Sequence, residues 1–125
     1  MLEERYIEVL AYNLETVLAE KLETVIARNI TNTRMRDFYD IYVLLQLYGD
    51  TLNSKVLKEA LIATTTKRAT EYHLDDLAMI FDEVEDDFTI QKLWKSYQNK
   101  FSYAEEVTWK MVMNSVRHLY QLTLS

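Results

Sequence analysis

The sequence predicts an all-α fold, a single bundle-like domain of five to six helices over residues 1–125. The chain has one glycine, Gly49, and no proline, whereas sheet-rich folds need turn residues at short intervals. Hydrophobic residues make up 49% of the chain, enough for one folded core. In several segments they recur at the i, i+3, i+4 spacing of a helix face. We expect a strand-like lead-in at 1–12 and a helical part at 13–125.

The lead-in is interpreted as a short strand because Ile7, Val9 and Ala11 alternate with other side chains in Tyr6–Ala11. A lone strand is not stable by itself. We therefore expect this segment either to pair in an oligomer or to be the trailing strand of a sheet whose other strands are encoded upstream.

Two amphipathic helices should follow the lead-in. Asn13 is a good N-cap for the first, which should run to about Arg28. The second should run from about Arg34 to Tyr48 and stop at Gly49. Because its second half is apolar nearly all round, we expect this helix to be the central, most buried one.

The rest of the chain carries further helix and loop signals. Thr64–Thr70 is polar and rich in β-branched residues, so we interpret it as a loop. Asn53 or Ser54 should cap the helix before that loop, and Thr108, or a residue just before it, should start the last helix. The other helices are expected at about residues 55–64, 74–85 and 89–99.

Composition argues against several classes of site. The absence of cysteine excludes disulfides and thiolate chemistry and fits a cytoplasmic protein. A single glycine is too few for a phosphate-cradling loop or a dinucleotide fingerprint. His73 and His118 have no ligand spacing around them, so no metal site is predicted in this chain. No apolar run approaches the length of a membrane span, so no membrane association is expected.

Lys21 is the first candidate for a functional residue. It falls inside the apolar stripe of the first helix, between Leu18 and Val25. A charged group that faces an interior is costly unless it has a partner or a task. In one interpretation the lysine stem lies along the core and its amine reaches water. In the other, the ammonium is held in a cleft and binds a phosphate.

Asp37 and Asp40 are the matching anionic candidates, at the front of the second helix. Acids favour the first turn of a helix, which accounts for Asp37 better than for Asp40. A buried pair of Asp37 with Lys21 or an arginine is a second structural explanation. The functional alternative is a carboxylate that holds a metal-bound nucleotide or accepts a proton from an attacking hydroxyl.

Five further cations are candidates for contacts to a nucleotide or an RNA. They are Arg28, Arg34, Arg36, Lys67 and Arg68. A local basic site on an acidic protein can still bind phosphate. However, the net charge of −6 argues against a stand-alone RNA-binding protein that uses these side chains.

The residues around Lys21 and Asp37 carry a resemblance to a known family. AYNLETVLAEKLETVIARNITNTRMRDFYDIYVL, from Ala11 onward, resembles the C-terminal half of AbiEii/AbiGii-type nucleotidyltransferase toxins. These are the toxin components of type IV toxin–antitoxin and abortive-infection systems. A weaker similarity continues through TTTKRAT and LWKSY, so the resemblance extends over the whole chain.

The resemblance implies a nucleotidyltransferase fold followed by a helical domain. In such toxins an N-terminal Gly-Ser motif and a pair of acids bind Mg²⁺ and an NTP, and the helices add a lysine and an aspartate. By motif position these catalytic residues are Lys21 and Asp37, with Arg36 and Asp40 as neighbours. The family transfers nucleotides to RNA acceptor ends, so an RNA acceptor and an antitoxin are the implied partners.

This chain departs from the family pattern because it contains no Gly-Ser motif. We expect the missing nucleotidyltransferase half to lie before Met1, which makes this chain a C-terminal fragment that is inactive alone. The alternative is a non-enzymatic helical interaction module. Such a module would bind an antitoxin, or form a homo-oligomer through exposed apolar surface.

Overall fold

The computed structural model describes residues 14–68 and 74–124, with side chains from residue 77 onward in the second range. The described residues form helices and contain no strand, so the all-α prediction is confirmed. The strand expected at 6–11 lies outside them. The α-helices are α2 (Leu14–Arg28), α3 (Met35–Tyr48), α4 (Ser54–Lys67), α5 (Leu74–Asp86), α6 (Phe88–Lys100) and α7 (Trp109–Leu122). Short 3-10 turns follow as η1 (Asn29–Thr31), η2 (Gly49–Thr51) and η3 (Ser102–Ala104).

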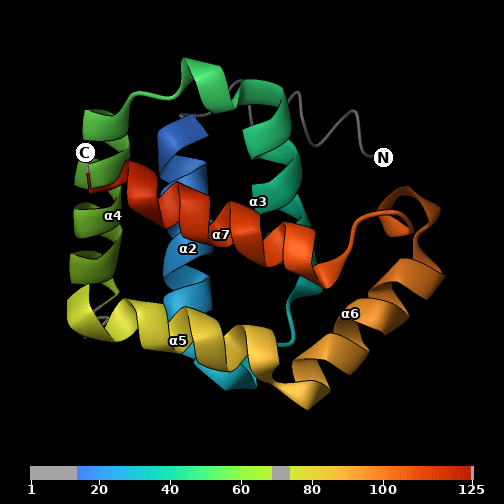
Figure 1. The fold of residues 1–125 in the computed structure, drawn as a ribbon. Coiled ribbons are helices and arrows are strands. Elements are labelled where there is room, and N and C mark those ends of the chain that lie inside the picture. The colour runs from blue at the N-terminus through green and yellow to red at the C-terminus, as the bar shows by residue number, and fades with distance from the viewer. Residues whose placement is uncertain (1–13, 69–73, 125) are drawn as a thin grey trace.

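Helix α2 is the centre of the fold. It lies between α4 and α3, and α7 crosses over the three (Figure 1). Helix α5 runs across one end of this layer, and α6 extends outward from α5 beside the first part of α3 (Figure 1). Because α2 contacts helices on several sides, its stripe residues Leu18, Ala19, Leu22 and Val25 are fully buried.

Helix α3 is among the most buried helices of the described part, with seven buried residues as in α2, but α2 rather than α3 is central, and the second half of α3 is only partly buried. Leu47 is 55% exposed, and Tyr42, Val43 and Leu45 are only partly buried. Helices α2 and α7 cover one side of α3, while the other side faces solvent. Apolar residues all round a helix are typical of burial, but here the neighbouring helices do not surround it.

The loop expected at Thr64–Thr70 is also corrected in part, because α4 continues to Lys67. Thr64 and Thr65 are buried against the fold, at 8% and 7% exposure. The Thr65 hydroxyl donates to Leu61 O at 2.9 Å within the same helix. Tertiary burial and this bond outweigh the low helix propensity of threonine. Residues 69–73 lie outside the described ranges.

Three helices begin at capping side chains that accept a backbone N–H, as helix starts favour. Asn53 caps α4 and Thr108 caps α7, each at 3.1 Å, which confirms these two predicted boundaries. Asp87 caps α6, because its carboxylate accepts from the backbone N–H of Ile90 at 2.9 Å. The cap at Asn13 lies outside the described residues.

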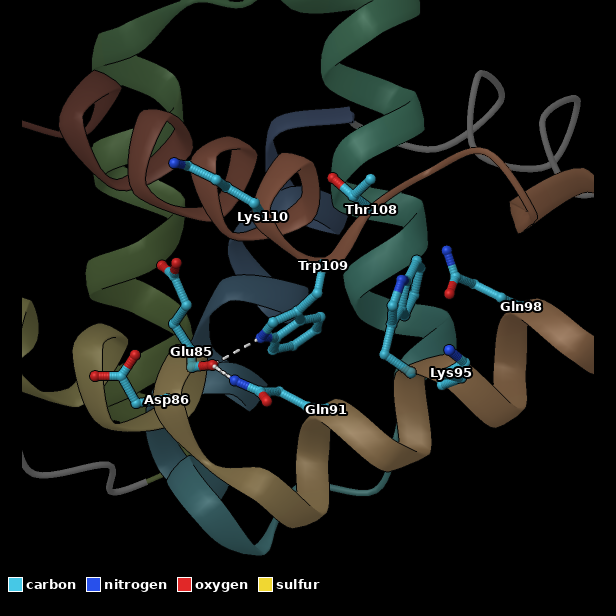
Figure 2. A pocket seen from close by; sticks show the side chains of 9 residues that line it. Glu85, Asp86, Gln91, Lys95, Gln98, Thr108, Trp109 and Lys110 are labelled. Carbon is cyan, nitrogen blue, oxygen red and sulfur yellow. Dashed lines mark hydrogen bonds between the residues drawn. The ribbon is translucent and has the colours of Figure 1, made fainter.

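Two tryptophan hydrogen bonds join α6 and α7 to the rest of the fold. Trp109 Nε1 donates to Glu85 O at 3.0 Å, and Gln91 Nε2 donates to the same carbonyl at 2.8 Å (Figure 2). Trp94 Nε1 donates to Val107 O in the same manner, at 3.0 Å. None of the helices in the described part of the chain has the length and apolar character that a membrane crossing needs.

Candidate functional site: the α2–α3 ion cluster

Lys21 meets both predicted aspartates where α2 and α3 pack together. Its Nζ atom donates to Asp37 Oδ1 at 3.1 Å and to Asp40 Oδ2 at 3.0 Å. The lysine side chain is 19% exposed, and the two aspartate side chains are 7% and 5% exposed. The ammonium is therefore neither free in solvent nor sealed in the core, but held at the edge of the interior by two buried carboxylates.

The local sequence explains this arrangement. Asp37 and Asp40 are three residues apart on α3, so they lie on the same face of that helix. Lys21 lies within the buried stripe of α2, next to fully buried Leu22. Since α2 and α3 pack against each other, the lysine and the carboxylates neutralise one another at the helix contact. The lysine–aspartate pair expected as one structural explanation is present, and Asp37 also lies in the first turn of α3, as the other explanation expected.

Arg34 extends the cluster from the start of α3. Its Nε atom lies 3.0 Å from Asp37 Oδ2, an ion pair whose angle does not meet hydrogen-bond geometry. The two oxygens of Asp37 therefore face two different cations. The Arg34 side chain is 54% exposed, so most of its guanidinium donors remain open to solvent.

Arg68, just past the end of α4, approaches the same place from the other side of α2. It donates to buried Glu23 at 2.8 Å and lies 3.8 Å from Glu20. The hydrogen bond to Glu23 raises the pKa of Arg68, and the charges of both glutamates add to that rise against a smaller lowering by burial. These contacts therefore favour the charged form of Arg68.

These side chains surround a shallow depression of about 140 Å³. Three cations, Lys21, Arg34 and Arg68, border it, and the carboxylates beneath and beside them fix their positions. The ammonium of Lys21 has three N–H donors, and two are used on Asp37 and Asp40. Cationic donors of this kind are the groups that contact small anions such as phosphate in proteins. The other lining residues are Val17, Glu20, Thr24 and Asp37.

The carboxylates of this cluster do not fit a Mg²⁺ site. Mg²⁺ prefers carboxylates that are free to coordinate it, usually with several waters. Here Asp37 and Asp40 are held by Lys21, and Glu23 is held by Arg68. Among the side chains that the structure describes, in residues 14–68 and 77–124, no group of three metal-ligating residues is present either.

The other predicted cations lie apart from the depression. Arg28 is exposed in the last turn of α2, and Lys67 is exposed at the end of α4. Neither lines the depression. Arg36 is exposed too and lines a larger groove on the other side of Arg34. The structure thus brings Lys21, Arg34, Arg68, Asp37 and Asp40 together and leaves these three cations outside.

Glu20 and Glu23, which hold Arg68, were not among the residues predicted from the sequence. A signal for Glu23 existed, because it lies four residues after Ala19 and three before Ile26, both of them buried. That spacing places a carboxylate within the buried side of α2 and calls for a cationic partner. The sequence did not indicate which cation would pair with Glu23, since Arg68 is 45 residues away.

Comparison with known proteins adds one result. The family model described as nucleotidyl transferase AbiEii toxin, type IV TA system, matches residues 1–120. This range includes every member of the ion cluster. No curated protein and no solved structure matches the chain.

Proposed function

The chain belongs to the AbiEii family of nucleotidyl transferase toxins of type IV toxin–antitoxin systems. On this premise we propose that the depression at Lys21 binds the phosphates of a nucleotide that the toxin transfers to an RNA acceptor. The observation that carries the proposal is the ammonium of Lys21, fixed by two buried carboxylates at the border of a depression that Arg34 and Arg68 also line.

A phosphate in this depression would meet donors from three elements. Lys21 contributes its remaining N–H, and Arg34 contributes guanidinium donors that no residue of the described part engages. Arg68 adds positive charge, although its hydrogen bond to Glu23 limits the donors it can offer. Because the carboxylates already hold the cations in place, little side-chain entropy would be lost on binding.

Asp37 is proposed as a positioning residue rather than as a general base. Its oxygens face Lys21 and Arg34, at 3.1 and 3.0 Å, and its side chain is 7% exposed. A base must come within hydrogen-bond reach of the hydroxyl that it deprotonates, and here both cations occupy that space. Asp40 supports Lys21 in the same way from the next turn.

The remaining parts of the reaction are proposed to come from a second segment. Phosphoryl transfer depends on positioning a triphosphate and its metal. The described carboxylates do not fit the metal, and the chain has no Gly-Ser motif. We therefore expect the isolated chain to be inactive and a polypeptide that also carries the Gly-Ser segment to be active.

The test is transfer of a radiolabelled nucleotide to RNA. The chain alone should give no labelled RNA, whereas the toxin with its Gly-Ser segment should give it. Lys21→Ala should abolish labelling in that toxin, and Lys58→Ala, an exposed change on α4, should not. Arg34→Ala should raise the KM for the nucleotide without unfolding the chain, since Arg34 is largely exposed. Full activity of the Lys21→Ala toxin would overturn the assignment.

A second candidate function is antitoxin binding without catalysis, because the family implies an antitoxin partner. A groove of about 420 Å³ between α3 and α7 favours it, with the apolar residues Tyr42, Leu45 and Met111 among its lining. Met111→Glu should then release an antitoxin that co-purifies with the chain in size-exclusion chromatography with light scattering. A chain that elutes as a monomer and retains no antitoxin would exclude both this candidate and self-association.

A further inference from the structure

A second and larger hollow lies on the other side of Arg34. This α3–α6 groove, about 450 Å³ in volume, runs between the start of α3 and the last turns of α6. It is separate from the hollow between α6 and α7 drawn in Figure 2. Its lining combines cationic, aromatic and small polar side chains, among them Arg34, Arg36, Ser96, Tyr97, Lys100 and Phe101.

The charge of the α3–α6 groove is opposite to that of the whole chain. Arg34, Arg36 and Lys100 line it, and its single acidic lining residue is Asp37, which Lys21 already neutralises. Neither Arg36 nor Lys100 forms an ion pair with any described residue. In a chain of net charge −6, this local excess of positive charge favours a negatively charged ligand.

The aromatic side of the groove is held by ring contacts and a hydrogen bond, and it is only partly covered. The rings of Tyr97 and Phe101 are 4.7 Å apart, and both residues keep intermediate exposure. The Tyr97 hydroxyl shares a 2.7 Å hydrogen bond with Tyr103, and its ring stacks on Trp94 at 5.3 Å. The ammonium of Lys100 lies 5.5 Å from the centre of the Phe101 ring. A positive charge and an aromatic surface are therefore in direct contact in the groove.

The two hollows are adjacent, because they share two lining residues. Arg34 and Asp37 line both the depression at Lys21 and the α3–α6 groove. A chain of nucleotides that lies in the groove would therefore end next to the cluster around Lys21. A ligand confined to the groove would instead contact Arg36 and Lys100 without reaching Lys21.

We propose that the α3–α6 groove binds a single-stranded segment of the RNA acceptor. Arg36 and Lys100 contact its phosphates, and a base packs against Tyr97 and Phe101. Positive grooves with aromatic side chains bind single strands in this way, because unpaired bases offer their faces for stacking. This inference rests on the proposed transfer to RNA and adds the site that would hold the acceptor.

The composition of the groove favours a polynucleotide over a free nucleoside triphosphate. A triphosphate usually enters a transferase with Mg²⁺, which needs carboxylate ligands. The groove offers only the carboxylate of Asp37, which lies between Lys21 and Arg34. RNA phosphates carry single charges and can be bound by separate arginine and lysine side chains without a metal.

The test is the affinity of the full 125-residue chain for a fluorescent single-stranded RNA, measured by anisotropy at low salt. The double variant Arg36→Ala/Lys100→Ala should bind about tenfold more weakly or worse. It should also reduce the slope of log affinity against log salt by about 1.4, because two phosphate contacts are lost. The control Lys55→Ala/Lys58→Ala removes the same charge from the exposed side of α4 and should bind like the parent chain.

Three further ligands make the result specific. An abasic strand of equal length should bind more weakly than the RNA, since it has no base to stack. A duplex RNA should also bind more weakly, and ATP should not displace the RNA at comparable concentration. Equal losses in the two double variants, no binding by the parent chain, or displacement by ATP would each overturn the proposal.

This measurement is independent of catalysis. If no toxin labels RNA but the Arg36→Ala/Lys100→Ala variant selectively loses RNA affinity, RNA binding in the groove is supported and the proposed nucleotide transfer is rejected. If labelling needs Lys21 but Arg36→Ala/Lys100→Ala changes neither the RNA affinity nor the KM for RNA, the nucleotide transfer is supported and RNA binding in the groove is rejected.

Discussion

The Nζ atom of Lys21 in α2 lies 3.1 Å from Oδ1 of Asp37 in the first turn of α3. Asp40 approaches the same ammonium from the next turn, at 3.0 Å. Both aspartate side chains are more than nine-tenths buried. One partly exposed lysine is therefore the shared partner of two buried carboxylates, so this ion cluster supports the α2–α3 contact as well as the proposed phosphate site.

Replacing Lys21 with methionine should destabilise the protein by about 3 kcal/mol. Removing one partner of a buried ion pair costs this much because the remaining buried charges lose a counter-charge. The measurement is the free energy of unfolding from urea titration. Lys58→Met is the matched control, since Lys58 is exposed on α4 and should change stability by less than about 0.5 kcal/mol.

The stability lost in Lys21→Met should be smaller when Asp37 and Asp40 are replaced by neutral asparagines as well. In Lys21→Met/Asp37→Asn/Asp40→Asn no buried charge lacks a counter-charge, so we expect this triple variant to be more stable than Lys21→Met. If Lys21→Met and Lys58→Met unfold at the same urea concentration, the lysine does not compensate buried charge.

Arg68→Ala should destabilise the fold by about 1 kcal/mol. The change removes a charge-assisted hydrogen bond to Glu23, whose side chain is 4% exposed. The expected loss of stability is small for a charge-assisted hydrogen bond because the Arg68 side chain is itself 43% exposed. Lys67→Ala is the control, because Lys67 is the preceding residue and is exposed. Equal urea midpoints for the two variants would show that the contact to Glu23 adds no stability.

The helix boundaries around the ion cluster could be predicted closely. Apolar spacing and the break before Arg34 placed the end of α2 at Arg28, where the structure has it, and the start of α3 within one residue. A lysine in a buried stripe and two acids three residues apart on the next helix also suggested a partnership. Short connections bring consecutive helices together, so these contacts follow from local sequence.

Contacts between distant segments could not be predicted in this way. The pairing of Arg68 with Glu23 depends on how α4 lies against α2, which no local pattern specifies. For the same reason the helix at Thr64–Lys67 was missed, since its stability comes from burial against the fold rather than from propensity. The second half of α3 is apolar but only partly buried. An apolar pattern does not reveal how many neighbouring helices cover a helix.

Thr108→Ala should destabilise the protein by about 1 kcal/mol, because it removes the side-chain oxygen that caps α7. Helix α7 crosses α3 and contacts α5, so fraying of its first turn should affect global unfolding. Thr108→Ser keeps a hydroxyl in the same place and should retain most of the stability. If the serine and alanine variants are equally destabilised in urea, the cap does not contribute through its hydrogen bond.

The carbonyl of Glu85 should couple Trp109 energetically to Gln91. This carbonyl belongs to the last turn of α5, where helix carbonyls lack partners in their own helix. It accepts from both side chains, at 3.0 and 2.8 Å. Either Trp109→Phe or Gln91→Ala leaves one donor in place, whereas the double variant leaves none. The double variant should therefore lose at least about 0.5 kcal/mol more stability than the sum of the single changes.

A double-mutant cycle from urea unfolding measures this coupling, and the packing lost with the indole cancels within it. Gln98→Ala provides the control cycle with Trp109→Phe. Gln98 lies on the same helix as Gln91 but donates to Val107 O, at 2.7 Å, rather than to the Glu85 carbonyl. The control pair should be additive within about 0.3 kcal/mol. Equal coupling in both cycles would mean that the interaction passes through general packing of α6 rather than through the shared carbonyl.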